Sequence, residues 1–400
     1  MFIHNKKKKF ILSVINILIE VVSMPGKLLR KKIDPKLINP SKILLLRLDH
    51  IGDVVMTSPS YTLMRERFPH AKILLLTNEA GRQLYEPDPR IDEVWVFNWP
   101  WAQQRTREKF SWSKIKELWD IISKLRSEKI DVFVDFRGDL RFTILFGVLT
   151  GALFRVSSSR SGKSSLLHHM SDYDISKHEV ERSLDIVRCF GNLEGPVRPS
   201  LYLSQQDTDE IRQLISKVIR RAIPEKLAII APYSSRDIKS WPESYFTDTI
   251  SFLKQGGFTI LIVGTAGDRE HSNNIVSLFS DSVYSFAGTT SVRQLATLVS
   301  LSDIVVGVDT GVLHLAACFD VPIVALFGST RAVEFRPYSP FAVVVESHTC
   351  TCNQFLHLTC SKPVDGYARC MSDLKPMAVL KAIEVIISGA DRSVVSAREL

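Results

Sequence analysis

The sequence predicts an α/β protein made of two doubly wound domains, each a parallel sheet with helices on both faces. Short, continuously apolar runs alternate with longer amphipathic segments, the alternation stops at a stretch rich in Gly and Pro, and it then begins again. Continuous apolar runs are typical of parallel strands that are buried on both faces. The length of 400 residues suffices for two domains.

The first half begins at Ser41 and alternates strands with helices. Right-handed crossovers between such strands produce a doubly wound sheet. The expected strands are 42–47, 71–77, 92–97 and 131–136, and the expected helices are 54–68 and 112–129.

The stretch 191–200 contains the Gly and Pro residues that mark a boundary, and the same alternation follows it. The expected strands of the second half are 226–233, 258–264, 303–309 and 322–328, and the expected helices are 207–221, 243–255, 268–279 and one from Gly311. We therefore divide the chain into an N-terminal segment 1–40, a first domain 41–200, a linker helix 201–225, a second domain 226–385 and a tail 386–400.

The composition is that of a globular protein with an anionic partner. Hydrophobic residues make up 45% of the chain, charged residues 24%, and the net charge is +8. Such a charge suits a nucleic acid, an acidic membrane surface or a phosphorylated substrate. The basic residues do not form a long stripe interleaved with aromatic residues, which argues against nucleic acid.

Two segments, one in the N-terminal segment 1–40 and one in the first domain, are candidates for membrane contact. Residues 10–24 are apolar at helical spacing, are flanked by lysine clusters and are too short to span a bilayer. This pattern favours an amphipathic helix on an anionic membrane surface, and the alternatives are a helix packed on its own domain and a signal peptide. Residues 97–119 are rich in Trp, Lys and Arg, and they either contact a sugar acceptor or a membrane, or form a surface loop.

A candidate catalytic residue follows the first expected strand, in RLDHIGDVVMTSP (47–59). Gly52 allows a close backbone approach to a ligand, and open α/β sheets bind their ligands at the carboxyl ends of strands. Neither a G-x-G-x-x-G pattern nor a P-loop lysine occurs here, which argues against a dehydrogenase or an NTPase. Asp53 can act as a general base or can cap the following helix, and Asp49 competes for either role.

Ser234, Ser235 and Lys239 follow the first strand of the second half, in APYSSRDIKSWPESYF (231–246). Hydroxyls, backbone amides and a lysine are groups that bind phosphate. The same residues are also consistent with a polar loop that carries a solvated lysine.

The stretch 307–330 is the most specific feature of the second half. A strand is expected to end at Asp309, and Thr310 and Gly311 lead directly into a helix. Asp309 or Thr310 can cap this helix, whose free N–H groups favour an anion. His314 follows within the helix, either as a ligand contact or as a core histidine.

Together, these motifs resemble glycosyltransferase family 9, the lipopolysaccharide heptosyltransferase family. The resemblance rests on RLDHIGDVVMTSP, SSRDIKSWP and DTGVLHLAACFDVPIVALFG, with further similarity in HEVERSLDIVRCFG (178–191) and in 287–309. It extends from about Ser41 to Met377. Each motif alone is weak, but their combination and order are specific.

The resemblance implies a GT-B fold, two Rossmann-like domains facing each other across a cleft. It implies inverting transfer of a sugar without an essential metal or other cofactor. Asp53 would be the catalytic base, Ser234, Ser235 and Lys239 would hold the donor diphosphate, and the donor pocket would be shaped by Asp309, Thr310, Gly311 and His314.

This chain departs from the family pattern at two sites, and its basic N-terminal extension before Ser41 also lies outside that pattern. Ser234 and Ser235 stand where family members commonly have threonines, a mild change because both residue types supply hydroxyls. The acidic residue that would contact the donor sugar is either Asp268 or Glu270, and we take Asp268 as the candidate.

The expected function is therefore transfer of heptose or a related sugar from an ADP-linked or similar donor. The expected acceptor is the lipopolysaccharide core or another lipid-linked oligosaccharide, on the cytoplasmic face of the inner membrane. The alternatives are a nucleotide-sugar epimerase with the same fold and a non-catalytic scaffold that binds nucleotide-sugars. Asp53 argues against the scaffold, because a pure binding protein needs no base.

A cysteine cluster near the C-terminus is the last candidate site. Cys350, Cys352, Cys360 and Cys370 can bind zinc, although the spacing of the last pair is poor for standard zinc modules. The alternative is a set of structural thiols, with an occasional disulfide, that shapes a loop.

Overall fold

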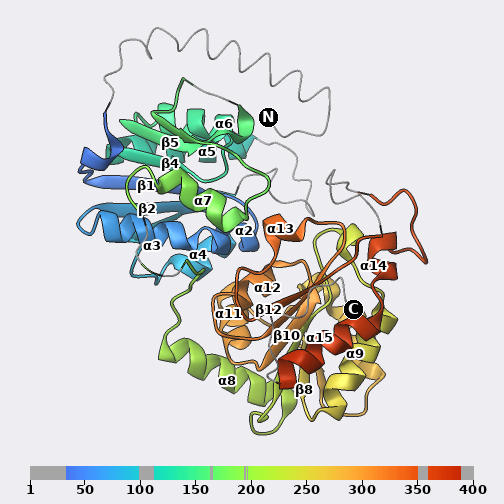
Figure 1. Cartoon of the computed structure of the whole chain (residues 1–400). Coiled ribbons are helices and arrows are strands. Elements are labelled where there is room, and N and C mark those ends of the chain that lie inside the picture. Colours follow the sequence, from blue (N-terminus) through green and yellow to red (C-terminus); the bar gives the residue numbers. More distant parts are fainter. Residues whose placement is uncertain are drawn as a thin grey trace. The chain divides into compact units, whose positions relative to one another are not determined.

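The chain forms two compact units, Met1–Tyr202 (unit 1) and Leu203–Leu400 (unit 2), in a computed structural model (Figure 1). The structure describes residues 33–98, 112–162, 165–192, 195, 197–349 and 359–388. Most of the predicted N-terminal segment, residues 99–111 of the Trp-rich segment, Cys350, Cys352 and most of the predicted tail lie outside these residues.

Unit 1 contains, within its described residues, a six-stranded parallel sheet in the order β3-β2-β1-β4-β5-β6. The strands are β1 (Lys42–Arg47), β2 (Lys72–Thr77), β3 (Glu93–Val96), β4 (Val132–Asp135), β5 (Phe154–Ser158) and β6 (His169–Ser171). The α-helices are α2 (Ile51–Met56), α3 (Ser58–Arg67), α4 (Glu79–Tyr85), α5 (Trp112–Glu128), α6 (Leu140–Phe142) and α7 (Glu179–Val187).

Unit 2 repeats this topology, again within the described part of the chain, in the order β12-β11-β10-β7-β8-β9. The strands are β7 (Leu227–Ala231), β8 (Thr259–Ile262), β9 (Val283–Ser285), β10 (Ile304–Val308), β11 (Ile323–Phe327) and β12 (Ala342–Glu346). The α-helices are α8 (Gln205–Ile219), α9 (Glu243–Gln255), α10 (Arg269–Ser277), α11 (Val292–Ser300), α12 (Gly311–Ala316), α13 (Ala332–Phe335), α14 (Arg369–Asp373) and α15 (Pro376–Ser388).

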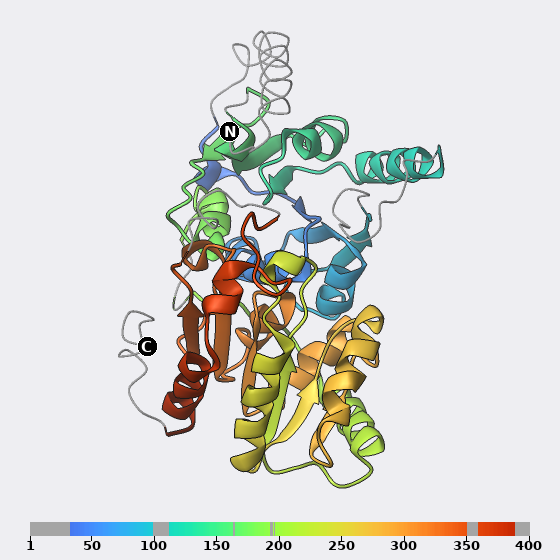
Figure 2. The ribbon, with the colours of Figure 1, turned by 90° about the vertical axis from the view of Figure 1, so that its right-hand side faces the viewer.

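Both faces of the unit 2 sheet are covered by helices, as Figure 2 shows. Successive residues of a strand point to opposite faces. Ile229 of β7 therefore packs in a core with α8, α11 and α12, while its neighbour Ile230 packs in a second core with α9 and α15. This double burial explains why the strands read as continuous apolar runs.

The strand order places a topological switch point in each unit. Successive connections leave in opposite directions from β1 and β4 in unit 1, and from β7 and β10 in unit 2. Doubly wound sheets bind ligands outside the carboxyl ends of the strands at such points.

A glycine is required at position 307 of β10, because a Cβ added to Gly307 would lie 2.6 Å from the carbonyl oxygen of Ala231 in β7.

The predicted helix 54–68 is wrong in one respect, because two helices occupy this region. α2 begins at Ile51, and the helix is interrupted at Thr57, before α3 begins. Pro59 lies at the start of α3 and has no N–H to continue the hydrogen bonds of α2. The earlier start brings Gly52 and Asp53 into the first turn of α2.

α8 is part of the unit 2 core. Its N-terminus is closed by a capping box between Ser204 and Asp207, and Ile211, Ile215 and Ile219 are buried beneath it. In the part of the chain that the structure describes, no helix combines the length and apolarity needed to cross a bilayer.

Candidate functional site

Asp53 lies in the first turn of α2, directly beyond the carboxyl end of β1, and its side chain is 26% exposed. His50 occupies the N-cap position, so the interpretation of Asp53 as an N-cap is wrong. The carboxylate instead forms an ion pair with Arg47, with 3.5 Å between Oδ1 and Nη2. Asp53 is thus a partly accessible carboxylate that is held in place by the buried Arg47. Gly52 is buried beside it.

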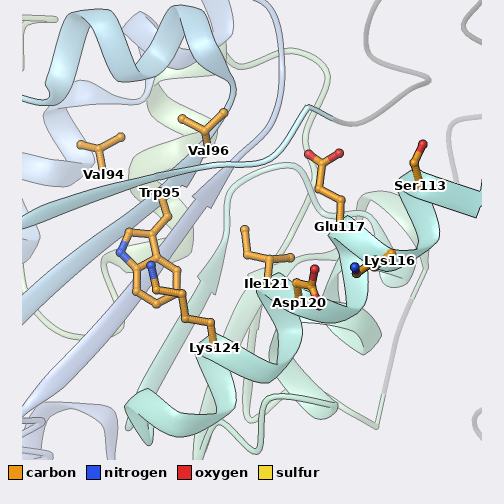
Figure 3. Close-up of a pocket in the computed structure, with 9 residues that line it drawn as sticks. All are labelled: Val94, Trp95, Val96, Ser113, Lys116, Glu117, Asp120, Ile121 and Lys124. Atoms are coloured by element: carbon orange, nitrogen blue, oxygen red, sulfur yellow. The ribbon is translucent and has the colours of Figure 1, made fainter.

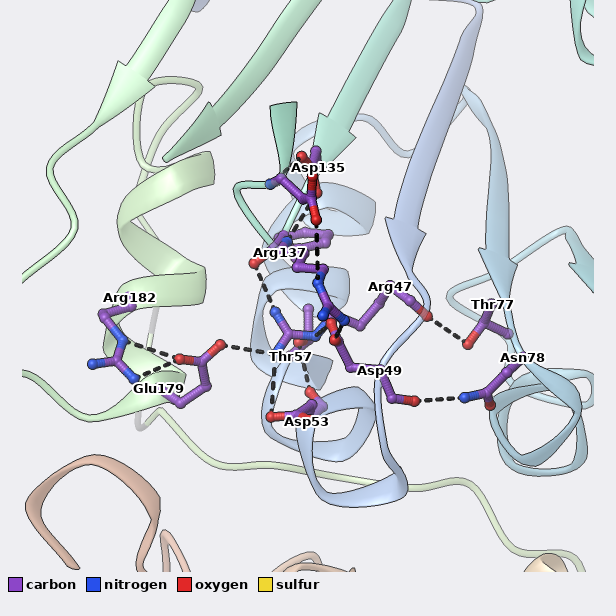
Figure 4. Close-up of polar contacts among 12 residues, drawn as sticks. Arg47, Asp49, Asp53, Thr57, Thr77, Asn78, Asp135, Arg137, Glu179 and Arg182 are labelled. Atoms are coloured by element: carbon purple, nitrogen blue, oxygen red, sulfur yellow. Dashed lines mark hydrogen bonds and ion pairs between the residues drawn. The ribbon is translucent and has the colours of Figure 1, made fainter. Parts of the chain in front are cut away.

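Arg47, the last residue of β1, is a buried cation at the centre of this site, with 2% exposure (Figure 4). Its guanidinium donates to the carbonyl oxygen of Phe136 at 2.6 Å and to Glu179 at 2.8 Å. It also forms an ion pair with Asp49 at 3.1 Å. The register of β1 and β4, with Leu46 opposite Asp135, places Phe136 next to Arg47.

Glu179 at the start of α7 is the closest acidic partner of Arg47, at 2.8 Å. Its other oxygen accepts from Arg182 at 2.7 Å. Burial alone would raise the pKa of Glu179, but Arg47 and Arg182 lower this pKa to about 2. An ionised Glu179 therefore neutralises Arg47 through Nη2, the same nitrogen that pairs with Asp53 (Figure 4).

Asp49, the other carboxylate considered as a base, is buried between two arginines. It pairs with Arg47 and with Arg137, which follows β4. Burial lowers the pKa of Arg137 to about 10, with repulsion from Arg160 as the next cause. The structure thus leaves Asp53 as the more accessible of the two carboxylates.

Asp135, the last residue of β4, orders the loop that carries Arg137. Its carboxylate accepts from the backbone N–H groups of Arg137 and Asp139 at 2.9 and 3.1 Å. Burial raises the pKa of Asp135 to about 7, and the nearby Asp139 adds to this rise.

In unit 2, Lys239 and Asp309 meet at the switch point. Lys239 Nζ lies 2.6 Å from Asp309 Oδ2. Lys239 follows β7 and Asp309 follows β10, two neighbouring strands. Burial alone would raise the pKa of Asp309, but Lys239 lowers this pKa, with help from His314 and a hydrogen bond with Thr330. The carboxylate therefore stays ionised and holds the ammonium group in place.

The other predicted donor-binding residues lie in the segments that follow β7 and β10. Ser234 and Ser235 lie in the loop after β7, where Ser234 Oγ accepts from the backbone N–H of Arg236 at 3.4 Å. Thr310 is the N-cap residue of α12 but makes no side-chain cap bond, and Gly311 is the first residue of that helix. His314 is buried in the same helix, close enough to Asp309 to influence its charge.

Asp268, the candidate for a sugar contact, is buried after β8. Its carboxylate accepts from the backbone N–H and the hydroxyl of Thr265 at 2.8 and 2.5 Å, which closes a capping box. Asp268 therefore has a local structural role, and its contact with a sugar stays a prediction.

Of the cysteine cluster, only Cys360 and Cys370 lie within the described residues, and neither forms a disulfide there. Cys370 is buried in α14 against Gly328, where an added Cβ would lie 3.0 Å from its sulfur. The described residues include no group of three or more metal-ligating side chains.

The sequence interpretation did not identify Arg47, Glu179 or Arg137. The available signals were an arginine at the end of an otherwise apolar strand and a glutamate at the start of α7. Their contact spans 132 residues of sequence, so no local pattern reveals it.

Comparison with known proteins places this chain among sugar transferases. A family model described as glycosyltransferase family 9 (heptosyltransferase) matches residues 118–364. Lipopolysaccharide heptosyltransferase 2 of Salmonella typhimurium strain LT2 is 21% identical over 367 residues, which cover 87% of this chain and 99% of that protein.

Two solved structures share the fold. E. coli ADP-heptose lps heptosyltransferase II has a TM-score of 0.69 and 21% identity, covering 87% of this chain and 99% of its own. The glycosyl transferase family 9 protein from Veillonella parvula has a TM-score of 0.73 and 19% identity, covering 90% and 99%. These similarities confirm the predicted GT-B fold class.

Proposed function

Because this chain belongs to glycosyltransferase family 9, the heptosyltransferase family, we propose that it transfers heptose or a related sugar from a nucleotide-diphosphate donor. The acceptor is a lipopolysaccharide core or another lipid-linked oligosaccharide. The names of the relatives support both halves of this proposal: one solved relative is an ADP-heptose enzyme, and the Salmonella relative is a lipopolysaccharide enzyme. The family match also favours a transferase over an epimerase or a scaffold.

The single observation that carries the proposal is the arrangement around Asp53. A partly exposed carboxylate at a switch point is available to an acceptor hydroxyl, and Arg47 forms an ion pair with it. In the proposed step the acceptor oxygen attacks the anomeric carbon, and its proton passes to Asp53. The bond from that carbon to the diphosphate breaks, and the nucleoside diphosphate leaves with the bonding electrons. Attack opposite the leaving group inverts the anomeric configuration.

We assign donor binding to the loops at the carboxyl ends of the unit 2 strands. Lys239 supplies the cation for the diphosphate, and Asp309 orients it through the 2.6 Å contact. The hydroxyls of Ser234 and Ser235 supply further hydrogen bonds, while Thr310, Gly311 and His314 shape the pocket. The lysine stabilises the negative charge that develops on the leaving group, so we propose that no metal ion is required.

We place the protein on the cytoplasmic face of the inner membrane, where a lipid-linked acceptor would be presented to it. The basic, amphipathic residues 1–40 support this location. Most of them lie outside the described residues, so this part of the proposal rests on sequence alone.

A donor and acceptor panel tests the proposal. The protein is incubated with ADP-heptose, or with UDP- and GDP-hexoses, and with truncated lipopolysaccharide acceptors in buffer containing EDTA. We expect mass spectrometry to show an acceptor heavier by one heptose, with ADP released in equal amount. Conversion of the donor without acceptor, or binding without turnover, would contradict the proposal; restoration by added metal would contradict metal independence.

A further inference from the structure

α5 of unit 1 carries an outward-facing stripe, which we define as Trp112, Lys116, Trp119, Ser123 and Arg126. These residues recur at spacings of four and three, so they lie on one face of the helix. All five are exposed. Figure 2 shows α5 at the periphery of unit 1.

The stripe takes no part in the core of unit 1. The opposite face of α5 does, because Ile122 and Leu125 are buried in that core and Leu118 and Ile121 pack against it. Folding therefore explains one face of α5 and leaves the other unexplained.

The exposure of two tryptophans on this stripe is unusual. Trp112 is 86% exposed and Trp119 is 56% exposed. Trp95 and Trp241, the other tryptophans that the structure describes, are buried. Large exposed apolar side chains that share one face commonly mark an interaction surface.

The charges on the stripe are of one sign. Lys116 and Arg126 belong to it, and no acidic residue does. The acidic residues Glu117 and Asp120 line a groove of about 630 Å³ between α5 and β3, and Lys116 of the stripe lines it too (Figure 3). Asp120 is exposed beside the stripe, where Lys116, Lys124 and Arg126 outnumber it. Lys124 lies in that groove over the ring of Trp95, at 4.1 Å from its centre.

We propose that the stripe on α5 is a contact surface for an anionic lipid bilayer. Tryptophan rings favour the level of the lipid headgroups, and the flanking cations would pair with acidic headgroups. A stripe one helix wide, with two apolar residues separated by charges, is too narrow for the apolar centre of a stable protein interface. This inference goes beyond the sugar transfer and would survive its failure.

The test uses the full chain and lipid titration. Binding midpoints are measured by vesicle flotation, with vesicles of phosphatidylethanolamine and phosphatidylglycerol and with phosphatidylcholine vesicles. For Trp112→Ser/Trp119→Ser we expect the midpoint on anionic vesicles to rise by about tenfold. Because binding free energies add for independent contacts, this rise persists if another segment also binds lipid. Leu278→Ser, at an exposed leucine of unit 2, is the matched control and should leave the midpoint unchanged.

A charge variant separates the two parts of the surface. Lys116→Glu/Arg126→Glu keeps both tryptophans, and it should weaken binding to anionic vesicles while leaving binding to phosphatidylcholine unchanged. Circular dichroism checks that each variant is folded. The proposal is overturned if the tryptophan variant binds anionic vesicles like the wild type, or if the wild type binds none. The proposal is also overturned if the wild type forms a dimer without lipid and the tryptophan variant is a monomer. The stripe would then contact a second copy of the chain.

Discussion

Arg47 and Asp53 form an ion pair at 3.5 Å, while the same guanidinium lies 2.8 Å from Glu179. The buried arginine thus holds Glu179 more closely than Asp53. Asp53 is therefore paired with a buried cation, yet its side chain remains 26% exposed. This arrangement suits a base that must accept a proton from a substrate and later release it.

A conservative change tests the role of this contact. Arg47→Lys keeps the charge but cannot reach Glu179, Asp53 and the Phe136 carbonyl together, because an ammonium group lacks the planar fork of a guanidinium. We expect kcat/KM for sugar transfer to fall by about tenfold or more. Arg65→Lys, which changes a partly exposed pair with Asp92, is the control and should retain full transfer. Equal activity of the Arg47 variant and the wild type would show that Arg47 does not position Asp53 for transfer.

Lys239 gives the corresponding prediction for unit 2. Lys239→Gln removes the cation and leaves Asp309 buried without its main partner. Calorimetric titration with the nucleoside diphosphate should show Kd raised by about tenfold to hundredfold. Lys254→Gln removes the lysine of another Lys–Asp pair in unit 2, with Asp281, and should leave Kd unchanged. A donor affinity that survives Lys239→Gln would exclude this lysine from the diphosphate site.

Asp135 gives a prediction about stability and pH. Its folded-state pKa is raised to about 7, whereas an aspartate in an unfolded chain has a pKa of about 3.9. Between these values the folded protein keeps a proton that the unfolded chain releases. The free energy of unfolding therefore falls as pH rises from about 4 through about 7.

Asp135→Asn should remove this dependence. The free energy of unfolding is measured by chemical denaturation at about pH 5 and about pH 8. Between these pH values it should fall by on the order of 2 kcal/mol more in the wild type than in the variant. The measurement follows the transition of unit 1 by circular dichroism. Identical losses in the two proteins would show that Asp135 titrates as an ordinary aspartate.

The N-terminal segment supplies a prediction that sequence alone supports. A chain that begins at Ser41 should bind anionic vesicles about tenfold more weakly than the full chain in the same flotation assay. Residual binding should then depend on the stripe on α5. Equal midpoints for the short and full chains would show that residues 1–40 do not anchor the protein.

The fold was predictable because its strands are buried on both faces. Continuous apolar runs such as 42–47 and 303–309 became β1 and β10 within one residue at each end. Short edge strands escaped prediction, because β6 and β9 have three residues each and carry little pattern. The interruption between α2 and α3 was not predicted, although Pro59 favours the start of a new helix there.

The candidate site was predictable only in part. The positions of Asp53, Lys239 and Asp309 were predictable because each follows a strand that the apolar pattern identifies, and the carboxyl ends of parallel strands share one edge. Their roles stay predictions. Which side chains touch is set by packing between elements distant in sequence. The Lys239–Asp309 contact spans 70 residues and the Arg47–Glu179 contact 132, so neither leaves a local signature.

The central claim is that Asp53 is the catalytic base, and Asp53→Asn tests it most directly. The substitution keeps the size of the side chain and removes its ability to take a proton. The measurement is kcat for heptose transfer from ADP-heptose to a truncated lipopolysaccharide acceptor, alongside the donor Kd of the same variant. We expect kcat to fall by about a hundredfold or more while the donor Kd stays within about twofold of wild type. A variant that transfers the sugar at the rate of the wild type would contradict the claim.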